Sequence, residues 1–173
     1  MSASRFASFS EFFPYYLGEH RNSTCRILHF FGTAGFFAAV VISLIREPQW
    51  FGAALGIGVV LGLIGNVIEA KRNAAPVLLS MVVVAAIAHP WVLLGVVWAY
   101  GFAWVGHFKI EHNRPATFVY PLWSLIGDFR MWGMMAGGRL WKGDPLAELG
   151  WTVRMPGDVT VDVVFPLDGQ TLP

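Results

Sequence analysis

Residues 27–45 read ILHFFGTAGFFAAVVISLI, a run that is apolar apart from His29, Thr33 and Ser43. A helix rises about 1.5 Å per residue, so a run of this length is long enough to cross the hydrocarbon core of a bilayer. Residues 50–68 form a second apolar run, and the charged, proline-containing segment at 46–49 separates the two. These two runs predict an integral membrane protein built from α-helices.

Two further apolar runs, 74–88 and 91–105, are split by His89 and Pro90. Each is short for a full span, so they are either two short spans or one long span kinked at the proline. Together they are too long for one span without a large tilt, which favours two spans. We therefore predict an all-α integral membrane bundle of about four transmembrane helices.

The distribution of basic residues supports an even number of spans. With four spans and both termini in the cytoplasm, eleven of the 12 Lys and Arg residues lie on the cytoplasmic side and Arg46 alone lies on the other. With three spans, everything from Lys109 onward would cross and this asymmetry would disappear. Short loops and the absence of sorting signals favour a bacterial plasma (inner) membrane.

Composition excludes several classes of protein. Hydrophobic residues make up 55% of the 173 residues and charged residues only 13%, against about 25% in soluble domains. The single Cys25 excludes an internal disulfide and a cysteine-rich metal site. The basic residues form no dense patch, so we expect no binding to nucleic acid. The oligomeric state is not indicated.

The segments that flank the spans are aromatic. Residues 6–17 and 117–141 mix aromatic with polar side chains, and we predict interfacial amphipathic helices there, with Phe12, Phe13 and Tyr16 among the membrane-belt residues. We divide the chain into a membrane-embedded catalytic domain (1–142) and a polar C-terminal tail (143–173). Within the tail, residues 159–163 alternate like a short strand.

Four of the five histidines fall in two short windows at the ends of the hydrophobic region. The first window is EHRN at 19–22 followed by His29, and the second is GHFKIEHNRP at 106–115. An even number of spans returns the chain to its starting face, where both windows could bind one metal ion. Imidazole with carboxylate suits Fe(II) or Zn(II). A closed zinc site, or a polar bundle core without metal, are the alternatives.

Spacing limits how these residues can be arranged. His20 and His29 are nine residues apart and cannot share one face of an unbroken helix, so we place His20 in a loop and His29 early in the first span. His107 and Glu111 are four apart and project from one helix face. Asn22 either orients a ligand histidine or caps a helix, and Glu19 has the same two options.

Arg114 has two interpretations. It either anchors a substrate carboxylate or faces the lipid headgroups. Ionisable groups at membrane depth are costly, which makes this whole cluster a candidate functional site. His89 lies on the predicted far face, remote from the other histidines, and we interpret it as structural.

The combined motifs resemble the 2-hydroxy fatty acid dioxygenase family of fatty-acid α-oxidation. The matching segments are YYxxEHxNx6H at 15–29, FxxxGHxxxExxRPA at 102–116 and YPLWS at 120–124, and the resemblance spans roughly residues 8–140. It implies an Fe(II)-dependent dioxygenase that uses O2 to shorten a long-chain 2-hydroxy fatty acid by one carbon, with its acyl chain in membrane lipid or between spans.

The resemblance also implies site residues. It makes His20, His29 and His107 metal ligands, with Glu111 as a fourth ligand or a supporting group. Family members often carry a basic residue at the position of His112, so no ligand role passes to that residue. Together with the spacing argument, we expect Glu19, Asn22 and Arg114 to take part in catalysis.

The reaction implied by the resemblance is chemically consistent, and alternative functions also fit the sequence. A 2-hydroxy acid can chelate iron through its carboxylate and hydroxyl, and one O2 accepts the four electrons released, so no further cosubstrate is required. The alternatives are a non-enzymatic small membrane transporter or lipid-binding scaffold, or another histidine–metal lipid enzyme such as a hydroxylase or hydrolase. Five histidines are too few for a di-iron lipid hydroxylase, which needs about eight.

Overall fold

The computed structural model describes residues 5–151, and every regular element in that range is helical. In chain order the elements are α1 (Phe9–Gly18), α2 (Ser23–Arg46), α3 (Pro48–Glu69), α4 (Ala75–Ala88), α5 (Trp91–Val105), η1 (Gly106–Glu111), η2 (Ala116–Phe118), α6 (Pro121–Ala136) and α7 (Pro145–Glu148). The all-α prediction is confirmed. The strand predicted at residues 159–163 lies outside the described residues.

Three helices are long and apolar enough to cross a membrane. They are α2, α3 and the continuous helix formed by α5 and η1, Trp91–Glu111. The fourth apolar helix, α4, has 14 residues and is shorter. Helix α4 ends at Ala88 and α5 begins at Trp91, so the prediction that His89 and Pro90 separate two helices is confirmed.

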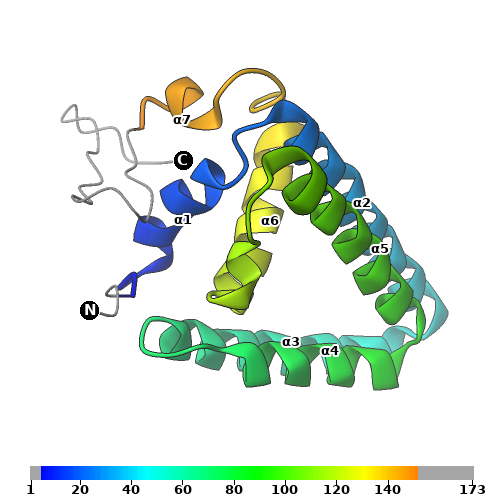
Figure 1. The fold of residues 1–173 in the computed structure, drawn as a ribbon. Coiled ribbons are helices and arrows are strands. Elements are labelled where there is room, and N and C mark those ends of the chain that lie inside the picture. The colour runs from blue at the N-terminus through cyan, green and yellow to red at the C-terminus, as the bar shows by residue number, and fades with distance from the viewer. Residues whose placement is uncertain (1–4, 152–173) are drawn as a thin grey trace.

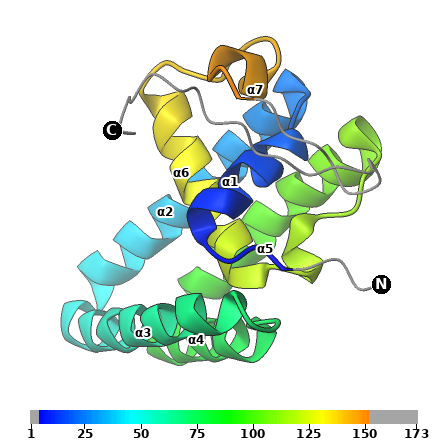
Figure 2. The same cartoon turned by 90° about the vertical axis from the view of Figure 1, so that its left-hand side faces the viewer.

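The four apolar helices form two pairs that meet at one corner (Figure 1). Helix α2 packs against α5, and α3 packs against α4. The α2–α3 and α4–α5 connections lie together at this corner, and the two pairs diverge from it like two sides of a triangle. Helix α6 closes the third side, and α1 lies against its outer face (Figure 2).

Small residues bring α2 and α5 close together. A Cβ atom added at Gly32 would lie 3.1 Å from the backbone oxygen of Ala99, and one at Gly95 would lie 2.8 Å from the Cβ of Ala39. Backbones that approach this closely gain van der Waals contact, which stabilises helix pairs in lipid. On α3, by contrast, neither Gly52 nor Gly56 has an atom within 4 Å of an added Cβ.

The main hydrophobic core lies outside the two pairs. It consists of residues from α1, α6, α7 and the segments beside them: Phe12, Phe13, Tyr16, Leu17, Ala116, Tyr120, Trp123, Met131, Met135, Leu140 and Leu146. The prediction that Phe12, Phe13 and Tyr16 are belt residues is therefore wrong, because each is at most 2% exposed. Docking of α1 on α6 gives these rings aromatic partners within the protein, such as Trp123.

Polar contacts tie the far end of α3 to the start of α6. The buried Glu69 carboxylate accepts a hydrogen bond from the backbone N–H of Leu122 at 3.1 Å. Asn66 accepts one from the indole N–H of Trp123 at 2.9 Å. A helix leaves its first N–H groups without partners, and Glu69 satisfies one of them on α6. The α3–α4 pair thereby fixes the position of α6.

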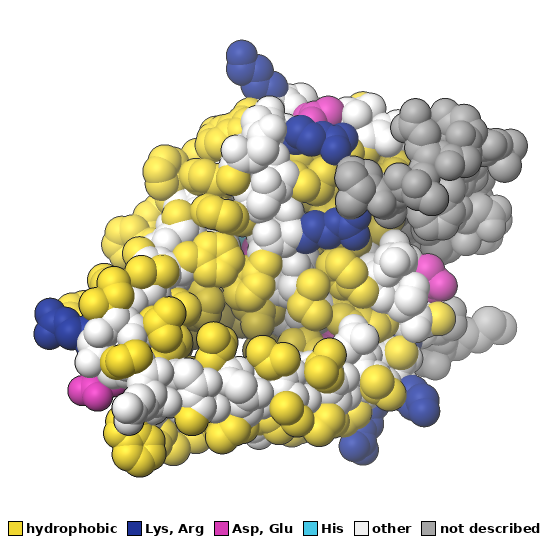
Figure 3. All heavy atoms as spheres, turned by 180° about the vertical axis from the view of Figure 1, so that it is seen from behind, with side chains coloured by type: hydrophobic (Ala, Val, Ile, Leu, Met, Phe, Trp, Pro, Cys, Tyr) yellow, Lys and Arg dark blue, Asp and Glu magenta, His cyan; other side chains and the backbone are white. Residues whose placement is uncertain are grey.

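The surface of the helical pairs is apolar. Ile45, Leu63 and Val97 are among the most exposed large hydrophobic residues. Hydrophobic side chains cover much of the face shown in Figure 3, and the Lys and Arg side chains lie at its edges and within its upper half. Large continuous apolar surfaces are rare on soluble monomers, so this surface is suited to lipid contact.

Candidate metal centre

Three histidines from separate parts of the chain meet beside the open end of the α2–α5 pair. His20 lies in the turn between α1 and α2, His29 lies on α2, and His107 lies on η1. Their ring centroids are 4.5 Å, 4.7 Å and 5.2 Å apart, and all three side chains are buried. One possible ligand atom from each lies within 4.8 Å of the others. The structure thus brings the two sequence windows together.

The turn that carries His20 is held by its neighbours. Asn22 is the N-cap of α2, and its side chain accepts a hydrogen bond from the Thr24 N–H at 2.8 Å. The fully buried Arg26 donates to the backbone oxygens of His20 at 2.8 Å and Arg21 at 2.7 Å. Because Arg donates through a planar fork, these bonds fix both the path and the orientation of the turn.

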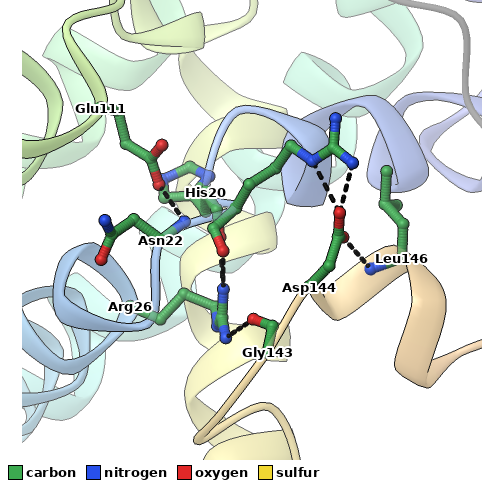
Figure 4. Close-up of polar contacts among 8 residues, drawn as sticks. His20, Asn22, Arg26, Glu111, Gly143, Asp144 and Leu146 are labelled. Carbon is green, nitrogen blue, oxygen red and sulfur yellow. Dashed lines mark hydrogen bonds and ion pairs between the residues drawn. The ribbon is translucent and has the colours of Figure 1, made fainter.

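Arg26 also connects the turn to the segment after α6. Its guanidinium donates to the backbone oxygen of Leu140 at 2.7 Å. It also donates to the backbone oxygen of Gly143 at 2.8 Å (Figure 4). Asp144 pairs with Arg21 and caps α7 by accepting from the Leu146 N–H. The described part of the predicted C-terminal tail, up to residue 151, therefore packs on the loop that carries His20.

His107 lies in a π-helical segment. Helix α5 widens into η1, and η1 ends at His112, whose φ of 54° is left-handed. This conformation turns the chain back, so the Asn113 N–H donates to the His107 backbone oxygen at 3.1 Å. Short π-helical segments are rare and frequently occur at functional sites. Here the segment brings the side chain of Asn113 next to the imidazole of His107.

The hydrogen-bond partner of His20 fixes its tautomer. Its Nδ1 lies 2.6 Å from the backbone oxygen of Tyr16. A carbonyl oxygen only accepts, so Nδ1 carries the proton and Nε2 keeps a free lone pair. That Nε2 is buried and has no hydrogen-bond partner. A buried acceptor without a partner is costly, which is expected if a metal ion binds there.

The other two histidines are held in the same way. His29 Nδ1 lies 2.6 Å from Asp128 Oδ1, and His107 Nδ1 lies 2.7 Å from Asn113 Oδ1. The Asn113 amide is itself oriented, because its Nδ2 donates to the backbone oxygen of Glu19 at 2.8 Å. Both oxygens act as acceptors, so both histidines also present Nε2 as the free nitrogen. The Nε2 of His29, like that of His20, is buried without a partner.

This donor set fits a metal ion. Metal-bound histidines almost always donate their other ring N–H to a carboxylate or carbonyl, which orients the ring and raises the basicity of the ligand nitrogen. All three histidines here have such a partner. Three neutral imidazoles, with no further ligand converging on them among residues 5–151, leave coordination positions open, which is typical of catalytic rather than structural sites.

Burial shifts the pKa values around the centre. Burial, together with the close neighbouring imidazoles of His29 and His107, holds the pKa of His20 well below 6.5. Burial and the Asp128 carboxylate raise the pKa of Tyr16 well above 10. The Tyr16 hydroxyl therefore keeps its proton and donates to Asp128 at 2.6 Å. Burial and the Glu111 carboxylate raise the pKa of Glu19 to about 7.

The remaining predicted residues surround the three histidines. Glu111 accepts from the backbone N–H of Asn22 at 2.7 Å (Figure 4), and it is not part of the converging ligand group found among residues 5–151. The Glu19 carboxylate accepts from Asn113 Nδ2 at 3.1 Å. The exposed side chain of Arg114 lies over the Phe118 ring, 4.8 Å from its centroid. The sequence-based roles of these residues stay predictions.

Three residues of the centre escaped the sequence analysis. Asp128, Asn113 and Tyr16 form side-chain or backbone hydrogen bonds with the histidines. Asp128 was a charge within an aromatic segment, and Tyr16 was interpreted as a membrane-belt residue and as part of a motif. A lone carboxylate among aromatic residues was a usable signal, but nothing in the sequence linked it to His29, 99 residues away.

Comparison with known proteins agrees with this arrangement. The protein family described as 2-hydroxy-palmitic acid dioxygenase Mpo1-like matches residues 6–140 of the chain. The match covers most of the chain and includes all three converging histidines, so the chain belongs to this family. No curated protein and no solved structure matches it.

Proposed function

We propose, from its membership of the 2-hydroxy-palmitic acid dioxygenase Mpo1-like family, that the protein is an Fe(II)-dependent membrane dioxygenase. It would use O2 to shorten long-chain 2-hydroxy fatty acids by one carbon. One observation carries the proposal: three buried histidines each have Nδ1 hydrogen-bonded to the protein, which leaves the three Nε2 atoms for a single ion.

His20, His29 and His107 would hold the iron. The bound ion would supply Lewis acidity and a place where the acid and O2 can both bind. The protein keeps the imidazoles neutral and oriented, which metal binding requires. Asp128 and Asn113 set two of the rings, and Glu19 sets the Asn113 amide. Glu111 supports the site from the Asn22 N–H in the present arrangement, and a ligand role would require that bond to break.

The reaction balances with these components alone. Oxidation of RCH(OH)COOH with O2 to RCOOH, CO2 and H2O removes four electrons from the acid, and one O2 accepts four. The C1–C2 bond breaks, the carbon at position 2 becomes the new carboxyl carbon, and no additional reductant or oxidant is required. The other ionisable groups of the centre are then needed for orientation and proton transfer only.

The fold supports a cytoplasmic site. Arg46 lies at the corner where the two helical pairs meet, while Lys71, Arg72 and Lys109 lie at the opposite ends of the helices. Basic residues concentrate on the cytoplasmic side of membrane proteins, so we place the histidines and both termini there. A bacterial inner membrane remains our proposal for the location.

The test uses detergent-purified protein loaded with Fe(II) in air. We expect 2-hydroxypalmitate to give the acid one carbon shorter by mass spectrometry. His107→Ala should lose both bound iron and product, whereas His89→Ala, at the opposite corner, should keep both. Bound iron without product would reject this substrate and keep the centre. Absence of both iron and product in the unmodified protein would instead favour a transporter or scaffold.

A further inference from the structure

A cavity of about 70 Å³ leads away from the histidines between α2, α5 and α6. His29, His107 and Asp128 line one end. Phe36 lies two helical turns further along α2, and Val96 lies about three turns before His107 on the antiparallel α5. At about 1.5 Å per residue, the stretch from His29 to Phe36 is roughly 10 Å long. The cavity therefore runs along the α2–α5 pair and not along the α3–α4 pair.

The lining of the cavity changes along its length. Nearer the histidines it includes three residues that carry a hydroxyl group, Thr33, Tyr100 and Thr117. At the far end it is apolar, with Phe36, Val96 and the aromatic ring of Phe129. This gradient matches a molecule with a small polar head and a hydrocarbon tail, because buried polar groups need partners and apolar groups do not.

No Lys or Arg is among the residues that line this cavity in the described chain. Arg114 does not line it and is exposed. A carboxylate in the cavity would therefore have its charge compensated at the histidine centre and not by an arginine. A ligand with a large anionic head, such as a phosphorylated ester, would find no cationic partner inside.

We propose that this cavity holds the first part of the alkyl chain of the acid, with Val96, Ala99 and Phe129 as the residues that accept it. The inference rests on the proposed function, because it places the head of the acid at the histidines. At the far end of the cavity, Phe36, Val96 and Phe129 are only partly buried. The cavity is therefore not sealed there, and the remainder of a long chain passes out into the bilayer.

Two substitutions on neighbouring positions test the path of the chain. Val96→Phe adds volume inside the cavity, and Val97→Phe adds the same volume on the lipid face, where Val97 is 69% exposed. Val96→Phe should lower kcat/KM for 2-hydroxypalmitate by at least about tenfold with bound iron unchanged. Val97→Phe should stay within about twofold, as expected for a surface substitution. Equal effects of the two variants would overturn the proposal.

Photolabelling tests binding without turnover. A long-chain 2-hydroxy acid with a diazirine in the first half of its chain should label residues 96–104 of the iron-loaded protein, and excess 2-hydroxypalmitate should remove this label. Labelling of Val96→Phe should fall in parallel with its kcat/KM. Labels confined to α3 and α4, or insensitive to competition, would refute the cavity as the chain site.

The two experiments separate the two proposals. Competable labelling at 96–104 without product in the unmodified protein would keep the chain site and reject the dioxygenase activity. Product formation with no difference between Val96→Phe and Val97→Phe would keep the activity and reject the chain site.

Discussion

The α2–α5 and α3–α4 pairs are both apolar and antiparallel, yet they differ in almost every contact that matters for the site. Helices α2 and α5 are far apart in sequence, approach closely at Gly32 and Gly95, and carry His29 and the π-helical extension with His107. Helices α3 and α4 are sequence neighbours, and α4 contains no buried residue. Hydrophobicity is common to both pairs, whereas His29 and His107 of the converging group lie on the α2–α5 pair and its extension.

The largest expected effect comes from forcing the close pair apart. Gly32→Leu places a side chain where Ala99 backbone and the Phe102 Cβ lie 3.1 Å away. Such overpacking should reduce the free energy of unfolding by about 1–3 kcal/mol. Because His29 and His107 lie on the two helices that separate, iron binding should weaken as well.

Gly56→Leu on α3 is the matched control. Gly56 has open space around it, and leucine is a better helix former than glycine. The free energy of unfolding should therefore change by less than about 1 kcal/mol. Cys25 is the single cysteine and is buried, so a thiol-reactive dye reaches it when the protein unfolds. The temperature at which the dye labels Cys25 therefore measures the stability of both variants. Equal destabilisation by the two variants would remove the distinction between the pairs.

A second, intermediate effect concerns the hydrogen bond between His29 on α2 and Asp128 on α6. Asp128→Asn removes the charge that holds His29 Nδ1–H but keeps the shape of the side chain. Loss of such a partner typically weakens metal binding by about 10–100-fold. Asp144→Asn makes the same chemical change at the partner of Arg21, which does not contact a histidine ring. This variant should keep the iron affinity within about twofold. Iron titration of both variants measures the difference, and unchanged affinity in Asp128→Asn would make this contact merely structural.

Local patterns in the sequence predicted a large part of the fold. Hydrophobic run length gave the four apolar helices, and Pro90 marked the break between α4 and α5. An even number of spans, with histidines at both ends of the hydrophobic region, predicted that His20, His29 and His107 lie on one face. All of these features depend on local composition or on counting how often the chain crosses.

Features that depend on contacts between distant segments were not predictable. Asp128 and Asn113 acquire their roles only when α6 and η1 pack against the histidine-bearing segments. The aromatic residues of α1 suggested a membrane belt because sequence alone does not show that α6 covers them. The glycines of α3 also differ among themselves, since Gly52 and Gly56 have open space around them whereas Val77 of α4 lies 2.8 Å from a Cβ added at Gly65. A pattern identifies a surface that permits contact, and the rest of the fold decides whether contact occurs there.

The smallest expected effect is the change in the free energy of unfolding of the metal-free protein with pH. It too arises from a residue of the histidine centre, His20. The pKa of His20 is held well below 6.5 in the folded protein, while in the unfolded chain it returns to about that value. Below pH 6.5 the unfolded chain therefore binds more protons, and the free energy of unfolding falls as pH falls. One such group contributes a slope of at most about 1.4 kcal/mol per pH unit.

Labelling of Cys25 between pH 7.5 and pH 5.5 measures this slope. His20→Asn should reduce it, because the variant lacks the imidazole at this position. Bound iron should keep or steepen it in the unmodified protein, because metal-bound rings take up no proton while the unfolded chain still does. An unchanged slope in His20→Asn would mean that the histidine turn is not what couples protons to folding. Glu19 could not be the source of such a slope, because its raised pKa makes stability fall as pH rises from about 4.5 through 7, which is the opposite direction.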